Sequence, residues 1–138
     1  MSLLIVMTLG TCGHSTHLNE TGLFLQLADR LMAQGISFKR LNAANWPDLG
    51  IENGPRDTYH RKILGHTPLF ALAPEGKYNS PEVTDDELLS QTHVFNATIE
   101  NGRVRYASPG RTPNLDNIME FVTTNAVFPP EIKEPAVL

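Results

Sequence analysis

Hydrophobic residues fall into short clusters along this chain, and their spacing predicts an alternation of strands and helices. The first cluster is a near-continuous apolar run over residues 3–9, which ends at Gly10. A short apolar run that ends at a glycine is typical of a strand buried on both faces. In residues 22–34 apolar residues recur at helical spacing, and Gly35 is a suitable stop for that helix. The chain is therefore expected to open with a buried strand, a polar loop and an amphipathic helix.

The start of this helix has two interpretations. Asn19 and Thr21 are both suitable N-cap residues, which would start the helix near Gly22. Alternatively, the helix begins near Cys12 and contains a break at Gly22. Only the second interpretation places a cysteine at a helix N-terminus, where free N–H groups and the helix dipole would stabilise a thiolate.

The middle of the chain continues the alternation. Residues 36–42 predict a second strand, and Pro55–Leu64 predicts a short helix with a proline at its first position. Thr67–Ala73 predicts a third strand, and a strand accepts a proline where it opens. If the first two strands are parallel, they form a right-handed βαβ unit with the helix between them. Three residues of the short helix are expected to face the core: Tyr59, Ile63 and Leu64.

Capping residues and prolines define the remaining segments. Residues 74–83 predict a polar turn region, and Thr84–Glu87 forms a capping box in front of a short helix. Asn114 is a suitable N-cap for a helix over Leu115–Thr124. Residues 126–138 have three prolines and no apolar period. They predict a tail that extends over the surface or over a partner.

A hairpin over residues 95–106 is the strongest local pattern. Asn101 and Gly102 are the residue types that a two-residue type I′ turn requires at its centre. Around this turn both strands sort into an apolar and a polar face in the same register, and a slip of one residue would destroy that sorting. The predicted pairs are Glu100 with Arg103, Ile99 with Val104, Thr98 with Arg105 and Ala97 with Tyr106, and the apolar face also includes Phe95.

The order of these elements predicts an α/β fold. We expect a single central sheet of about five strands with helices on its faces, followed by a C-terminal β-hairpin and helix. A length of 138 residues fits one domain. We place that domain over residues 1–125 and a proline-containing C-terminal tail over residues 126–138.

Composition narrows the classes of function. The net charge of −4 and the isoelectric point of about 5.7 argue against charge-driven binding to nucleic acid or to an anionic membrane surface. No run approaches the ~20 apolar residues of a membrane helix. Because the first lysine or arginine is Arg30, the opening apolar run lacks the basic flank of a signal peptide. The single cysteine cannot form an internal disulfide, which fits a reducing compartment, and a cytoplasmic location is expected.

Several pieces of the sequence, taken in order, resemble the thioredoxin/glutaredoxin superfamily. The first apolar run leads into Cys12-Gly13-His14-Ser15, a C-x-x-S arrangement similar to that of monothiol glutaredoxins. Residues 31–38 are similar to the end of the first helix and the second strand of glutaredoxins. Thr67-Pro68, at the start of a strand, is similar to the threonine and cis-proline that face the reactive cysteine in that superfamily. Residues 96–126 are similar to the closing hairpin and last helix of thioredoxins.

The resemblance implies a thioredoxin-like fold with a monothiol site. Cys12 would be the catalytic nucleophile and glutathione the co-substrate. A protonated His14 would stabilise the thiolate, and Ser15 would donate a hydrogen bond to the sulfur. Thr67 and Pro68 would face Cys12 and contact the substrate.

His66 directly precedes this threonine and would approach Cys12, where it would act as a proton donor or acceptor. The chain departs from the family in a longer stretch between Cys12 and the second strand, and in an insertion over roughly residues 74–93. Without a second cysteine, Cys12 would form only mixed disulfides or ligate a metal cluster between subunits. Alternatively, Cys12 is a small buried hydrophobic residue under a turn, and His66 is a loop histidine.

Two further patterns surround the cysteine. His14, His17 and Glu20 have a spacing that would place two imidazoles and a carboxylate on one helical face as a metal site. The other interpretation of these residues is a solvated polar loop. Residues 9–14 are also similar to the first loop of two-domain sugar-nucleotide glycosyltransferases, but that family needs a second domain for which this chain has no room.

Two functions from different classes follow. In the first, the chain is an enzyme that exchanges thiol and disulfide through Cys12, with glutathione or a thiol protein as its partner. In the second, it is a non-catalytic thioredoxin-like or other α/β subunit that binds a protein partner or itself through residues 126–138. The absence of a second cysteine favours the second function.

Overall fold

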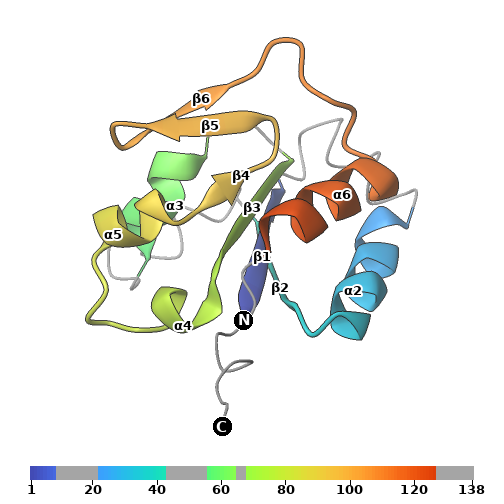
Figure 1. Ribbon diagram of the computed structural model, residues 1–138, viewed down its shortest axis with the longest axis horizontal. Coiled ribbons are helices and arrows are strands. Elements are labelled where there is room, and N and C mark those ends of the chain that lie inside the picture. Colours follow the sequence, from blue (N-terminus) through green and yellow to red (C-terminus); the bar gives the residue numbers. More distant parts are fainter. Residues whose placement is uncertain (9–21, 43–55, 65–67, 127–138) are drawn as a thin grey trace, which may run out of the picture.

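The structure, a computed structural model, describes residues 1–8, 22–42, 56–64 and 68–126 (Figure 1). A four-stranded sheet has the order β2-β1-β3-β4, and a separate two-stranded sheet pairs β5 with β6. The strands are β1 (Ser2–Thr8), β2 (Ser37–Asn42), β3 (Leu69–Pro74), β4 (His93–Val94), β5 (Ala97–Glu100) and β6 (Arg103–Tyr106). The helices are α2 (Leu23–Ala33), α3 (Asp57–Ile63), α4 (Glu75–Tyr78), α5 (Asp85–Ser90) and α6 (Leu115–Asn125).

Strand β1 is the centre of the molecule, and every one of its residues is buried. It pairs with β2 in parallel and with β3 antiparallel, and β4 then pairs antiparallel with β3. Because successive strand side chains point to opposite faces, Leu3, Ile5 and Met7 enter one apolar cluster while Leu4 and Val6 enter the other. The prediction of a first strand buried on both faces is therefore confirmed.

The first cluster contains all three tyrosines of the chain, and we call its side of the sheet the tyrosine face. Helices α3 and α5 and the β5–β6 hairpin lie on this side, to the left of the sheet and above it in Figure 1. Tyr59 and Ile63 of α3 are fully buried, as predicted, and Leu64 is half-buried. The prediction of a polar turn over residues 74–83 is wrong in part, because this segment contains α4, whose Tyr78 is buried.

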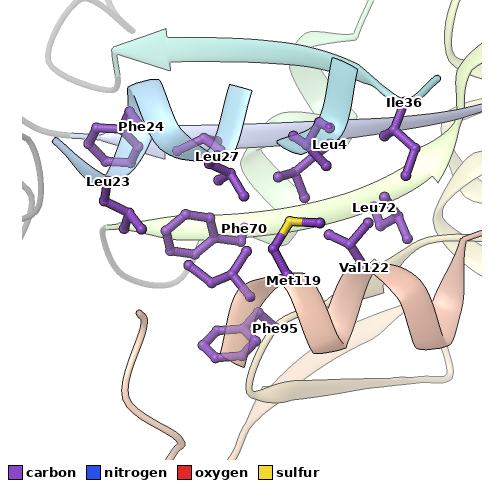
Figure 2. Packing of buried hydrophobic residues seen from close by; sticks show 13 residues of the cluster. Leu4, Leu23, Phe24, Leu27, Ile36, Phe70, Leu72, Phe95, Met119 and Val122 are labelled. Carbon is purple, nitrogen blue, oxygen red and sulfur yellow. The ribbon is translucent and has the colours of Figure 1, made fainter. Parts of the chain in front are cut away.

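The second cluster lies on the opposite side of the sheet, which we call the phenylalanine face. Helices α2 and α6 cover it, and their apolar side chains meet those of β1 and β3 between them (Figure 2). Helix α2 begins at Leu23 after Gly22, whose φ of 78° suits a residue without a side chain. Residues 9–21 lie outside the described part of the chain, and the prediction of an earlier helix start near Cys12 falls on them. The phenylalanines of this cluster are Phe24, Phe38, Phe70, Phe95 and Phe121.

The hairpin has the predicted register but not the predicted place in the fold. All four predicted pairs, from Glu100–Arg103 to Ala97–Tyr106, are present. The prediction of one five-stranded sheet is wrong, because β5 and β6 pair only with each other among the described strands. Asn96 directly precedes β5 with a φ of 63°, a left-handed conformation that asparagine tolerates. The strand direction changes there, and the hairpin lays its apolar side on the tyrosine face.

This change of direction also corrects the position of Phe95. The alternation of the predicted hairpin placed Phe95 with the apolar residues of β5 and β6. In the structure Phe95 belongs to the phenylalanine face, where its ring packs edge-on against Phe70 and Phe121 at centroid distances of 6.1 and 5.7 Å. Strict alternation fails because the left-handed residue Asn96 interrupts the extended backbone.

Both predicted helix caps are present. The Thr84 hydroxyl accepts a hydrogen bond from the backbone N–H of Glu87 at 3.1 Å, at the start of α5. The Asn114 side-chain oxygen accepts one from the backbone N–H of Asn117 at 2.8 Å, at the start of α6. Each bond satisfies one of the N–H groups that the first turn of a helix leaves without a partner.

Candidate functional site

The end of β1 and the start of β3 meet at one edge of the sheet. Met7 of β1 lies opposite Leu69 of β3 in the antiparallel register. Thr8, the last residue of β1, and Pro68, directly before β3, are both buried. The chain therefore leaves β1 and enters β3 at neighbouring points of this edge.

Most of the predicted site residues lie outside the described part of the chain. This holds for Cys12, His14 and Ser15 after β1, and for His66 and Thr67 before β3. The predicted metal ligands His17 and Glu20 and the peptide bond between Thr67 and Pro68 also lie outside it. Of the predicted site, the structure describes Pro68 alone.

The start of the segment that leads to Pro68 is held by the hairpin. The Tyr106 hydroxyl of β6 donates a hydrogen bond to the backbone carbonyl of Ile63 at 2.5 Å. Ile63 is the last residue of α3, and the last carbonyls of a helix have no partner within it. The bond satisfies one such carbonyl and ties the hairpin to the end of α3. The sequence predicted Tyr106 on the apolar side of the hairpin, but a side-chain bond to the distant residue 63 carries no local signal.

A groove of about 870 Å³ lies between β4, the hairpin, residues 107–111 and α6. Phe95 and Phe121 contribute rings to it, and His93 lines it as an exposed residue. The sequence did not predict this groove, because it arises from the separation of the hairpin from the main sheet.

Polar side chains shape one wall of the groove. The Asn96 side-chain amide donates to the carbonyl of Arg111, and its oxygen accepts from the Arg111 N–H, both at 2.8 Å. Arg111 in turn forms an ion pair with Glu120, and Arg105 forms one with Glu100 at 3.4 Å. Because each of these arginines faces a carboxylate, the groove offers no excess of charge to attract an ionic ligand.

A buried arginine organises the tyrosine face. Arg56, directly before α3, is 6% exposed. Its guanidinium donates to the carbonyls of Lys77, Tyr78, Ser80 and Val83, and to the carboxylate of Asp85 at 2.8 Å. These five hydrogen bonds use the full donor capacity of an arginine side chain. Arg56 therefore holds α4 and the start of α5 against α3, and it is not available to an outside ligand.

The hydroxyls of Tyr59 and Tyr78 on this face are hydrogen-bonded and stay protonated. Tyr59 meets the Thr92 hydroxyl at 2.8 Å, and Tyr78 meets Nε2 of His60 at 2.7 Å. Burial raises the pKa of Tyr78 to about 12 and the pKa of Tyr59 further still. These hydroxyls are therefore structural hydrogen-bonding groups and not bases at neutral pH.

Neither a metal site nor a membrane-spanning helix occurs among the described residues. Within those ranges no three histidine, cysteine, aspartate or glutamate side chains gather closely enough to hold a metal ion. Across the same ranges no helix has the length and apolar character needed to cross a membrane.

Comparison with known proteins found no matching protein family, no matching curated protein and no matching solved structure.

Proposed function

We propose that this chain is a thioredoxin-like protein in which Cys12 exchanges thiol and disulfide groups, with glutathione or a thiol protein as its partner. One observation carries the proposal. The proposed site needs a cysteine that follows the first strand to face a proline that opens the third strand. The end of the first strand must therefore lie beside the start of the third. The antiparallel pairing of Met7 with Leu69 meets this condition. If the third strand were parallel to the first, its start would lie at the opposite end of β1, and Cys12 and Pro68 would be separated by about the length of a strand.

The length of chain beyond β1 agrees with this arrangement. Cys12 is the fourth residue after Thr8, and four residue-to-residue steps span at most about 14 Å. Pro68 directly precedes β3 at the same edge. A thiol placed anywhere within that radius of Thr8 stays near the edge at which β3 begins.

The proposed reaction has two balanced steps. The Cys12 thiolate attacks one sulfur of a disulfide, so that a bond forms to that sulfur while the old S–S bond breaks and the other sulfur leaves as a thiolate. A glutathione thiolate, or a second thiolate of the substrate, then attacks the substrate-derived sulfur of this mixed disulfide, so that a new S–S bond forms and Cys12 leaves as a thiolate. Nothing is oxidised or reduced overall beyond the exchange of partners.

The pH dependence of Cys12 alkylation by iodoacetamide tests the proposal on the folded full chain. Since Cys12 is the only cysteine, the reaction reports a single thiol. An activated site gives rapid alkylation with a pKa well below the ordinary thiol value of about 8.5. Slow alkylation with an ordinary or raised pKa contradicts the proposal. Cys12→Ser is the control that must abolish the signal.

A second function, a non-catalytic subunit that binds a copy of itself, is favoured by a different observation. Leu25 and Met32 of α2 are 77% and 75% exposed and lie seven residues apart on one side of the helix. A pair of large exposed apolar residues at this spacing suits contact with another helix. Sedimentation equilibrium tests this self-association. The unmodified chain should associate, and Leu25→Gln should associate more weakly. An unmodified chain that stays monomeric at high concentration contradicts the second function.

A further inference from the structure

The four methionines of the chain differ widely in exposure. Met7 of β1 is fully buried and Met119 of α6 is 8% exposed, whereas Met32 of α2 is 75% exposed. Met1, before β1, is 55% exposed. A thioether reacts with an oxidant only where the oxidant reaches its sulfur. Two methionines of the folded chain are therefore open to oxidation, and two are shielded by the core.

Met32 lies on the last turn of α2, beside the turn that leads into β2. Its backbone carbonyl accepts a hydrogen bond from the Gly35 N–H at 3.1 Å, and the residue lines a hollow of about 650 Å³ together with Ala28 and Phe38. The buried side of α2 consists of other residues: Leu23, Phe24, Leu27 and Leu31. A polar atom added at the Met32 sulfur therefore leaves the packing of the phenylalanine face in place.

Oxidation would change the polarity of the surface that Met32 shares with Leu25, seven residues earlier on the same side of α2. The thioether sulfur attacks one oxygen of a hydroperoxide, so that an S–O bond forms while the O–O bond breaks. The leaving hydroxide or alkoxide takes the proton of the transferred oxygen. The sulfur loses two electrons and the peroxide gains them, and the product is a polar sulfoxide in place of an apolar side chain.

We infer that Met32 is a redox switch of the α2 surface, at which a hydroperoxide forms a sulfoxide and thereby releases a second copy of the chain. The inference rests on the second proposed function, self-association through Leu25 and Met32. Because Met7 and Met119 are shielded, the chain oxidised at Met32 keeps its core and its fold. This retention of the fold distinguishes a switch from oxidative damage.

Peptide mapping by mass spectrometry, after treatment of the folded full chain with hydrogen peroxide, tests the selectivity of the reaction. Met32 should be converted to the sulfoxide while Met7 and Met119 stay unreacted, and the far-ultraviolet circular dichroism should not change. In concentrated urea all three should react alike, because unfolding removes the shielding. Oxidation of Met7 or Met119 in the folded chain as fast as that of Met32 overturns the inference.

Sedimentation equilibrium with and without peroxide tests the effect on association. Oxidation should raise the dissociation constant of the unmodified chain by about tenfold or more, because the contact of one apolar side chain is lost. Met32→Leu is the matched control, since leucine is apolar but has no sulfur, and its association should not respond to peroxide. Met32→Gln should associate weakly under both conditions. Peroxide also reaches Cys12 chemistry equally in all three chains, so a response confined to the unmodified chain belongs to Met32.

The outcomes separate this inference from the function on which it rests. If the unmodified chain associates and oxidation at Met32 leaves its dissociation constant unchanged, the inference is overturned and the second function stands. The same holds if peroxide weakens Met32→Leu as much as the unmodified chain. If the unmodified, unoxidised chain is monomeric, the second function fails first, and the inference fails with it.

Discussion

The two faces of the sheet are built from different aromatic residues and held by different forces. On the phenylalanine face two eleven-residue helices pack rings and aliphatic side chains against β1 and β3. On the tyrosine face the helices have four to seven residues, and each tyrosine hydroxyl has a hydrogen-bond partner. Both faces share the same central strands, so the contrast comes from the elements that cover them.

The length of the covering helices explains the contrast. Each α-helix leaves its first four N–H and last four C=O groups without partners inside the helix, so a helix of seven residues or fewer satisfies little of its own backbone. The tyrosine face must satisfy these groups from elsewhere, and it does so with Arg56, Tyr106 and Thr92. The longer helices α2 and α6 leave the same number of end groups, but they satisfy more backbone groups internally and bury a longer apolar side, and α6 also has the Asn114 cap.

Removal of Arg56 should give the largest effect. Arg56→Ala leaves four backbone carbonyls and the Asp85 carboxylate without their donor, and loss of one partner from a buried ionic network costs about 3–5 kcal/mol. We expect the free energy of unfolding, measured by urea denaturation, to fall by that amount. Lys62→Ala is the control, since its ion pair with Asp86 also joins α3 to α5 but is exposed, and it should cost less than 1 kcal/mol. Equal losses in the two variants would refute the organising role of Arg56.

A cavity on the phenylalanine face should cost slightly less. Leu27 of α2 is fully buried, and Leu27→Ala is expected to reduce the free energy of unfolding by about 3 kcal/mol through lost transfer energy and the cavity left behind. Leu25→Ala, two residues earlier on the exposed side of the same helix, should stay within about 0.5 kcal/mol. If Leu25→Ala proves as costly as Leu27→Ala, the assignment of the buried side of α2 is wrong.

Alkaline pH should weaken the tyrosine face selectively. The pKa of Tyr78 is about 12 in the folded chain and about 10 in the unfolded chain, so its contribution is complete below pH 10 and is lost as pH rises toward 12. At pH 12 the ionisation of Tyr78 alone should lower the free energy of unfolding by about 2 kcal/mol. Burial of Tyr59 acts in the same direction. Between pH 10 and 12 the stability of Tyr78→Phe should therefore fall less steeply than that of the unmodified chain. Parallel curves would contradict the protonated, buried state of Tyr78.

These two faces also differ in how well the sequence predicts them. Helices α2 and α6 and the hairpin register follow from periodicity, an N-cap and an Asn-Gly turn, all of which are local signals. The tyrosine face depends on contacts between distant residues, such as that of Arg56 with residues 77–85. Nothing in the local sequence pattern around Arg56 indicates that this charged residue is buried.

The residues of the site were predicted from the resemblance to the thioredoxin/glutaredoxin superfamily. Of that prediction, the structure describes only Pro68 and the pairing of β1 with β3 beside it. The meeting of β1 and β3 at one edge depends on strand order, which a single sequence does not encode locally. The hairpin was expected in the main sheet because its pattern suits any sheet, and the left-handed backbone of Asn96 redirected it. The groove beside α6 arises from that redirection and was missed for the same reason.

The smallest expected losses of stability come from the two helix caps, and they test whether the two faces unfold as separate units. Thr84→Ala and Asn114→Ala each remove one N-cap bond, and each should cost about 1 kcal/mol. The Thr84 cap starts the same helix whose first residue, Asp85, bonds Arg56, whereas Asn114 caps α6 on the opposite face.

A double-mutant cycle uses this difference. If Arg56 and Thr84 act on one cooperative unit, Arg56→Ala combined with Thr84→Ala should deviate from additivity by more than about 0.5 kcal/mol, because α5 is already displaced when its cap is removed. Arg56→Ala combined with Asn114→Ala should be additive within about that limit. Urea denaturation of the unmodified chain, the three single variants and the two double variants provides both coupling energies. Strong coupling between Arg56 and Asn114 would mean that the two faces form one cooperative unit through β1. The faces would then differ in the residues that build them but not in their contributions to the free energy of unfolding.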